Sequence, residues 1–248
     1  MAKFTVSDEV FEIFPDACFG VVVAEIAGDP IEISSLEATM RLEADRVRAA
    51  LKSAQDVRAH PNVSAWRDAF VRLGLNPNRF PSSIEALLSR VARGGAPPSV
   101  NPVVDAANTV SLRHLVPIGA HDAGTFAGDI ELRISGNGDM FTPFGEIDPE
   151  PVPPGEIVYA CGNQVRTRKW VWRQSEIGKI VPSTARVFFP IDGFAGKTDD
   201  CVRRARRDLA MLCRDMLGAG IVREMWVDAR SPSVNLGVNL GDNQGVDP

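Results

Sequence analysis

The stretch that decides the fold of this chain is residues 101–122, NPVVDAANTVSLRHLVPIGAHD. Its pattern predicts a helix start, an apolar helix, a Pro-Ile-Gly break and a polar turn. Asn101, Asp105 and Asn108 recur at i, i+4 and i+7, so they share one helical face. A polar stripe on an apolar helix fits the wall of a polar pocket, and it also fits a face that meets water or caps a neighbouring element.

Most of the expected helices lie before or within this stretch, and most of the expected strands follow it. The spacing predicts helices over residues 36–57, 64–73 and 82–93, with Ser34 and Ser35 capping the first and Ser82 the third. Strands are expected at 18–27, 129–135, 140–141, 156–161, 168–173, 186–191 and 222–227, with a hairpin-type turn at 136–139 and one late helix at 198–216. This order predicts an α+β fold with a helix-rich N-terminal half.

Length and composition describe one ordinary globular domain. The chain has 248 residues, 44% hydrophobic and 24% charged, and we expect a single domain over 1–228 and a flexible tail over 229–248. Neither a membrane-span-length apolar run nor a secretory signal pattern occurs, so the expected location is the cytoplasm. Cys18 and Cys161 lie in apolar runs that predict buried free thiols.

The sequence excludes several enzyme classes. It lacks a P-loop, a GxSxG nucleophile elbow and an HExxH helix, and none of its three histidines has metal-ligand spacing. We therefore expect neither a metal nor a cofactor. The net charge of −5 argues against DNA and against bulk electrostatic binding of nucleic acid, so an RNA partner would need local basic patches.

A second local pattern combines charge and aromatic groups. Residues 166–173, RTRKWVWR, would as a strand place Arg166, Arg168, Trp170 and Trp172 on one face. Tryptophan beside arginine suits stacking on single-stranded RNA, and two core tryptophans with a rim of arginines fit the pattern equally well.

His121 follows the helix break directly. A neutral histidine in such a turn is suited to act as a general base or to orient a water molecule. The alternative is a structural histidine without a catalytic role.

The motifs in order resemble a known family. Residues 101–110 (NPxxDxxNxV) and 117–122 (PxxAxD) resemble the core motif of the B3/B4 editing domain in the β subunit of bacterial phenylalanyl-tRNA synthetase. Residues 128–133, 155–160 and 184–189 resemble its later strands, and 77–88 and 168–173 are similar to stand-alone proteins built from this domain. The resemblance covers roughly residues 60–195.

The resemblance implies a β-sandwich-like core with surrounding helices and a pocket for the 3′ end of a charged tRNA. It implies hydrolysis of a wrongly attached amino acid, in trans because the synthetase's catalytic modules are absent. Two positions depart from the pattern. Gly119 stands where the synthetase domain has a histidine, with His121 two residues on, and Pro190 replaces the pocket acid, with Asp192 the nearest carboxylate.

Candidate residues follow from both lines of reasoning. The catalytic candidates are His121, Asn108 and Asp122. The substrate-binding candidates are Asn101, Asp105, Ser111, Gly119, Arg133 and Asp192. The tRNA-binding candidates are Arg168, Trp170, Trp172 and Arg173.

Three functions fit these candidates. The leading hypothesis is an aminoacyl-tRNA deacylase. The alternatives are a non-catalytic tRNA- or RNA-binding module and a protein that binds a small, amino-acid-like molecule.

Overall fold

Two β-sheets packed face to face form the centre of the molecule. The computed structural model describes residues 1–26 and 33–237. Its helices are α1 (Asp8–Ile13), α2 (Ile33–Ala50), α3 (Ala54–Ala59), α4 (Pro61–Arg72), α5 (Ser83–Ala92), α6 (Pro102–His114) and α7 (Asp199–Asp215), with a 3₁₀ turn at Ala123–Thr125. The predicted α+β class is confirmed.

The smaller sheet has the order β11-β2-β10-β3 and is antiparallel, with β2 (Ala17–Ile26), β3 (His121–Asp122), β10 (Arg186–Phe194) and β11 (Ala219–Asp228). The larger sheet has the order β12-β1-β4-β7-β8-β5-β6, with β9 beside β8. Its strands are β1 (Lys3–Val6), β4 (Ile130–Ile134), β5 (Met140–Phe141), β6 (Glu150–Pro151), β7 (Ile157–Cys161), β8 (Gln164–Arg168), β9 (Arg173–Gln174) and β12 (Ser233–Asn235).

Alternation along β10 separates two apolar layers. Phe188 faces the larger sheet, where Phe4 of β1 lies 5.3 Å from it between ring centroids. Val187 and Phe189 belong to the opposite layer, which packs against Leu209 of α7. A strand buried on both sides explains why this part of the sequence is almost continuously apolar.

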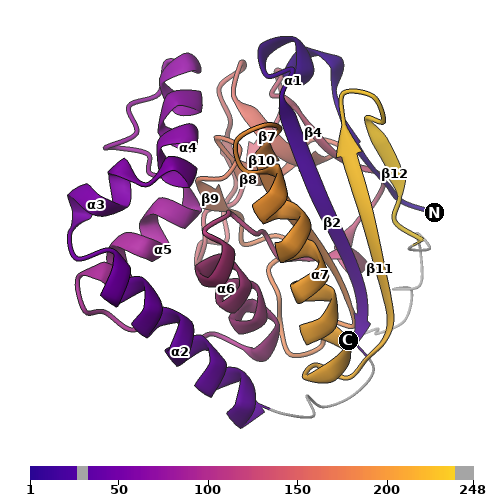
Figure 1. Cartoon of the computed structure of the whole chain (residues 1–248). Coiled ribbons are helices and arrows are strands. Elements are labelled where there is room, and N and C mark those ends of the chain that lie inside the picture. Colours follow the sequence, from indigo (N-terminus) through magenta and orange to yellow (C-terminus); the bar gives the residue numbers. More distant parts are fainter. Residues whose placement is uncertain (27–32, 238–248) are drawn as a thin grey trace.

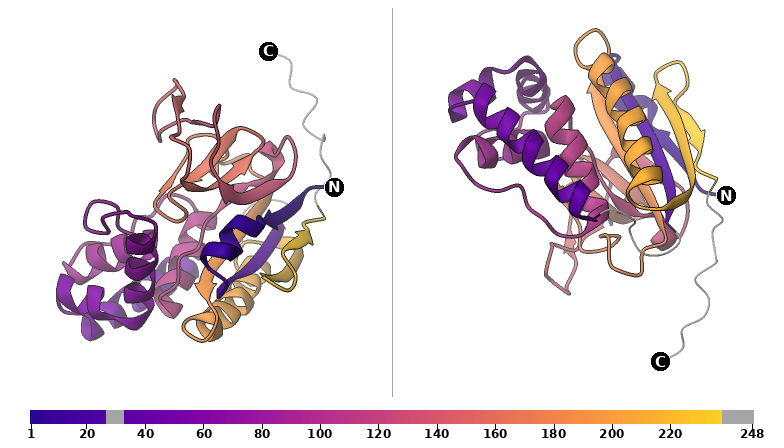
Figure 2. Two further views of the ribbon diagram at one scale, coloured as in Figure 1. Left: turned by 90° about the horizontal axis from the view of Figure 1, so that it is seen from above. Right: turned by 60° about the horizontal axis from the view of Figure 1, so that its bottom comes forward.

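The helices lie on two sides of the sheets. α7 covers the outer face of the smaller sheet (Figure 1). α2 to α5 gather beside the sheets, and α6 lies between that group and α7 (Figure 2). The expected buried positions of Cys18 and Cys161 are confirmed. No helix in residues 1–26 and 33–237 has the length and apolarity that a membrane crossing requires.

Several element predictions need correction. The helix expected over 36–57 breaks at Leu51, and a second helix, α3, begins after Ser53, whose side chain accepts the Asp56 N–H at 3.1 Å. α2 begins at Ile33, so Ser34 and Ser35 lie inside it and do not cap it. Gly28, Asp29 and Pro30 predict a turn after the first strand, and this prediction lies outside the described residues.

Two strand predictions are also wrong. β4 and β5 do not pair across residues 136–139, because β4 pairs with β1 and β7 while β5 pairs with β6 and β8. The strand expected over 168–173 ends at Arg168, where Lys169 (φ 47°) and Trp170 (φ 63°) turn the chain through left-handed conformations. Trp170 and Trp172 therefore do not share a strand face with Arg168.

Within the described residues, the tail expected from residue 229 is ordered. Ser233–Asn235 form β12, which pairs antiparallel with β1. Leu236 is fully buried in the main core. One short strand and one leucine are too weak a sequence signal to show that this segment joins the sheet and the core.

Candidate functional site

The segment after α6 forms one wall of the site. Leu115 adopts a left-handed conformation (φ 57°) that ends α6 and turns the chain. The chain then runs along β10, where the Gly119 N–H donates to the Pro190 carbonyl at 2.9 Å and the Asp192 N–H donates to the Pro117 carbonyl at 3.2 Å. Residues 117–121 are thereby held against residues 188–192.

Four buried side chains meet at the base of this wall. The Asp192 Oδ1 accepts hydrogen bonds from the Tyr159 hydroxyl at 2.6 Å and from the Trp170 indole N–H at 2.9 Å. The His121 ring lies 6.0 Å from the Tyr159 ring between centroids. All four side chains are at most 2% exposed, and they come from β3, β7, β10 and the turn after β8.

Burial shifts the ionisation of these groups in opposite directions. Desolvation raises the pKa of the Asp192 carboxyl to about 7, although Tyr159 and Trp170 donate to it. Desolvation and the nearby Arg166 guanidinium lower the pKa of His121 to about 3, so the imidazole is neutral at physiological pH. The pKa of Tyr159 is raised by burial and by Asp192.

A groove of two adjoining cavities opens above this cluster. The inner cavity, about 80 Å³, is lined by Gly119, His121, Tyr159, Trp170, Pro190 and Asp192 together with residues nearer its mouth. The outer cavity, about 340 Å³, lies between α5 and α6 and is lined by Arg90, Asn108 and Ser111 among others. Ser83, Ile118 and Trp172 line both, so the two cavities adjoin each other.

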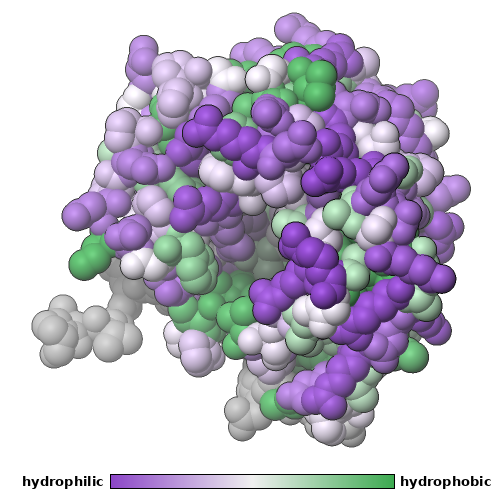
Figure 3. Space-filling view, turned by 90° about the vertical axis from the view of Figure 1, so that its left-hand side faces the viewer, coloured by the Kyte–Doolittle hydropathy of each residue, from purple (hydrophilic) through white to green (hydrophobic). Residues whose placement is uncertain are grey.

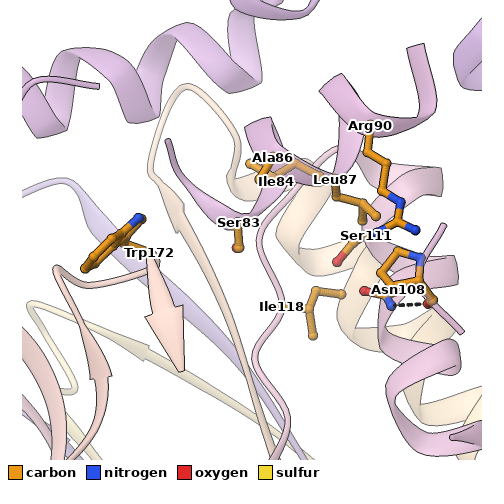
Figure 4. Close-up of a pocket in the computed structure, with 10 residues that line it drawn as sticks. Ser83, Ile84, Ala86, Leu87, Arg90, Asn108, Ser111, Ile118 and Trp172 are labelled. Atoms are coloured by element: carbon orange, nitrogen blue, oxygen red, sulfur yellow. Dashed lines mark hydrogen bonds between the residues drawn. The ribbon is translucent and has the colours of Figure 1, made fainter. Parts of the chain in front are cut away.

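The outer cavity has an aromatic side and a polar side. Trp172 stands on one side, and Leu87, Asn108 and Ser111 stand on the other, with Ile118 between them (Figure 4). The surface that carries α3 and α5 is hollowed near its centre, and apolar side chains line part of the hollow (Figure 3).

The sequence of this chain matches the B3/4 domain family model over residues 65–211. The chain belongs to the B3/4 domain family. Comparison with curated proteins gives no match. Among solved structures, the chain is similar to an N-terminal fragment of the phenylalanyl-tRNA synthetase β subunit from Pyrococcus horikoshii, with 11% identity and a TM-score of 0.44. The alignment covers 90% of this chain and 53% of that one, so the chain spans about half the length of that structure.

The two departures from the family pattern lie together in this B3/4 domain. A methyl group placed on Gly119 would lie 3.1 Å from the His121 Nε2 and 3.1 Å from the Pro190 Cγ. The missing side chain at Gly119 therefore makes room for the His121 ring. Sequence reasoning treated these positions as separate gaps, and only the pairing of the 117–121 segment with β10 brings them into contact.

Eight of the predicted site residues line the groove. Asn108 and Ser111 line the outer cavity, and the inner cavity is lined by Gly119, His121, Trp170, Trp172, Arg173 and Asp192. Trp170 is fully buried and contacts the rings of Trp66 and Phe14. It is therefore a core tryptophan, as the alternative to RNA stacking predicts. Trp172 is partly exposed at the junction of the cavities, and Arg173 is exposed beside it.

The carboxylate and amide stripe of α6 is mostly structural. Asn101 caps α6 by accepting the Val104 N–H at 2.9 Å. Asp105 accepts the Ser99 hydroxyl at 2.7 Å and the Val100 N–H at 3.0 Å, which fixes the chain leading into the helix. Neither residue lines the groove, so only Asn108 supports the prediction that this face walls a pocket.

The polar groups of three further candidates are bound to partners outside the groove. Asp122 uses one carboxylate oxygen for the Gly124 N–H and the other for the Thr184 hydroxyl. Arg133 makes a two-pronged ion pair with Asp139. Arg168 pairs with Glu156 and Glu150. Each polar group is satisfied by a local partner outside the lining of both cavities.

Sequence reasoning missed several lining residues. Tyr159 is the single tyrosine of the chain, and an isolated hydroxyl in an otherwise apolar strand was the available signal. Gln174 lines the inner cavity and donates to the Ala120 carbonyl at 2.7 Å. Ser83 and Arg90 reach the groove only because α5 packs beside α6, and no local pattern marks them. Among the described residues, no group of three or more His, Cys, Asp or Glu side chains is arranged to hold a metal.

Proposed function

We propose that this chain binds the aminoacylated 3′ end of tRNA in the groove and hydrolyses the aminoacyl ester in trans. The observation that carries the proposal is the groove itself. It places a small inner cavity, with a buried carboxylate and imidazole in its wall, beside a larger outer cavity whose rim carries the partly exposed Trp172 and the exposed Arg173, in a member of the B3/4 family. The small cavity suits the amino acid, and the larger one suits the terminal adenosine.

The roles follow from the chemistry of an activated ester. An aminoacyl ester requires a positioned water molecule and stabilisation of the oxyanion more than it requires a covalent nucleophile. His121, neutral and beside the inner cavity, is the residue we assign to orient the water. The Gly119 N–H is used by the Pro190 carbonyl, and Asp122 is used by Gly124 and Thr184, so we give neither a catalytic role.

The hydrolase proposal is tested with a panel of mischarged tRNAs. The purified protein should deacylate at least one of them, and His121→Gln should lower the single-turnover rate by at least about 100-fold. His114→Gln is the matched control, because His114 pairs with Asp208 on α7 and lines neither cavity. A panel that stays intact while a known deacylase clears it would refute the hydrolase claim.

The outer cavity gives a separate prediction for tRNA binding. Trp172→Ala should weaken binding of aminoacyl-tRNA roughly 5- to 100-fold, because base–aromatic stacking contributes about 1–3 kcal/mol per base. Trp172→Phe should retain most of the affinity. Trp226→Ala removes a partly buried tryptophan that stacks with Arg203 on the α7 side, and it should leave binding unchanged. Filter binding at fixed salt measures all three variants.

A second candidate is a non-catalytic module that binds tRNA. The structural use of Asp122 and of the Gly119 N–H favours it, because Asp122 is a catalytic candidate and Gly119 a substrate-binding candidate in the sequence. Measurable tRNA binding with no turnover across the panel would decide for this candidate.

A further inference from the structure

The geometry points to serine as the amino acid that the inner cavity receives, with aromatic rings excluded. This inference rests on the proposed function, since it assumes that the inner cavity holds the amino acid. It concerns selectivity and is independent of whether the ester is cleaved.

The volume sets the upper limit. The inner cavity measures about 80 Å³. A buried cavity of about 150 Å³ holds benzene, and one water molecule needs roughly 10–15 Å³. A phenyl or phenol ring therefore does not fit in this space, whereas a hydroxymethyl group does.

The walls are too well packed to widen at small cost. Trp170 is fully buried and lies 5.0 Å from the Trp66 ring and 5.1 Å from the Phe14 ring between centroids. Tyr159 is fixed by its hydrogen bond to Asp192 and by stacking on Phe4. Close-packed interiors resist a volume change of even one methylene group.

The buried polar groups in the wall of the cavity favour a hydroxyl over a methyl group. Both hydrogen bonds from Tyr159 and Trp170 go to Oδ1 of Asp192, and no other side chain in residues 1–26 and 33–237 donates to this carboxylate. The His121 Nε2 lies on the side of Gly119, which lines the inner cavity together with His121. A serine hydroxyl is both donor and acceptor, whereas alanine would leave these groups unpaired.

The first test measures binding without chemistry. Adenosine derivatives that carry serine, alanine, threonine or phenylalanine on a 3′ amide in place of the ester are titrated into the full chain by calorimetry. The serine derivative should bind at least about tenfold more tightly than the alanine and phenylalanine derivatives. Equal affinities, a preference for phenylalanine, or no binding of any derivative would overturn the inference.

The second test separates this inference from the proposed function. If no mischarged tRNA is hydrolysed while the amides bind in the expected order, the hydrolase claim fails and the inference stands. If phenylalanyl or tyrosyl esters are cleaved as fast as the seryl ester, the inference fails and the hydrolase claim stands.

A glycine pair provides matched variants. Gly119→Ala places a methyl group 3.1 Å from His121 and Pro190, so it should weaken binding of the serine amide at least about tenfold. Gly128→Ala meets no heavy atom within 4 Å and should leave binding unchanged. Thermal unfolding of both variants shows whether they fold, and the wild-type amide series remains decisive if Gly119→Ala does not. Unchanged affinity in a folded Gly119→Ala variant would contradict the inference.

Discussion

Asp192 is an acidic side chain in the middle of an apolar strand, and its environment explains how it is tolerated there. The carboxylate is 2% exposed and is held by the Tyr159 hydroxyl and the Trp170 indole. A buried carboxylate with two donors and no cation in contact is costly when ionised. Carboxyl groups with strongly shifted pKa values cluster at functional sites, which agrees with the place of Asp192 beside the inner cavity.

The raised pKa of Asp192 gives a pH-dependent prediction. The folded-state pKa is about 7 and the ordinary value is 3.8, so the folded protein binds the extra proton between these values. The contribution of this group to stability is therefore lost as pH rises from about 4 to 7. Asp192→Asn should remove this dependence. The free energy of unfolding of the variant relative to wild type should therefore increase by roughly 2–4 kcal/mol between pH 4 and pH 8.

Urea unfolding across this pH range measures the effect, with wild type and Asp192→Asn compared at each pH. His121 acts in the opposite direction, since its lowered pKa means that stability is lost as pH falls through 6.5. His121 is present in both proteins, so the difference between their stabilities at each pH reports the effect of Asp192. Parallel stability curves for wild type and variant would contradict the assignment.

Among the elements, α6 carries the clearest division between structural and functional residues. Its first turn is stabilised by Asn101 at the N-cap and by Asp105, which fixes residues 99–100. One turn later Asn108 and Ser111 face the outer cavity. The same polar stripe thus serves the helix start at one end and the groove at the other.

The cap assignment predicts a change in stability without a change in binding. Asn101→Ala should lower the free energy of unfolding by about 0.5–2 kcal/mol, and Asn101→Asp should retain most of it because aspartate also caps helices. Chemical denaturation measures the stability, and tRNA binding should be the same for all three proteins. Loss of tRNA binding in a folded Asn101→Ala variant would show that Asn101 belongs to the binding site.

In the whole molecule, strands from both ends of the described chain pair with each other at one edge of the larger sheet. β1 pairs with β4 on one side and with β12 on the other, so residues near 3 and near 235 become neighbours. Leu236 then packs into the main core together with Phe4 and Val6. The second sheet and α7 depend on this arrangement because β2 packs against the same core.

Leu236 provides the test at this scale. Leu236→Ala should lower the free energy of unfolding by about 2–5 kcal/mol, since it removes a fully buried side chain and leaves a cavity. Ile147→Ala is the control, because Ile147 is 93% exposed and its removal should change stability by less than about 0.5 kcal/mol. Thermal or urea unfolding compares the two variants. Equal stability of Leu236→Ala and wild type would show that the C-terminal segment does not belong to the core.

By itself, the sequence determined the local elements and the family. Periodicity and capping residues predicted α5, α6 and α7 and the strands β2, β4, β7 and β10, and the ordered motifs around Asn101, Asn108 and Asp122 indicated a B3/4 domain. These predictions succeed because hydrophobic period and cap chemistry act over a few residues. The turn at Lys169 and Trp170 was not predicted from the sequence, because φ values of 47° and 63° are imposed on these non-glycine residues by packing.

The tertiary structure alone decided the site. Asp122 and Arg133 carry the chemistry of functional residues, yet each is bound to a partner outside the groove. Tyr159 and Asp192 lie 33 residues apart in the chain and meet only because β7 and β10 belong to facing sheets. The contact between Gly119, His121 and Pro190 likewise depends on one strand register. Contacts of this kind depend on long-range packing, so no local pattern in the sequence encodes them.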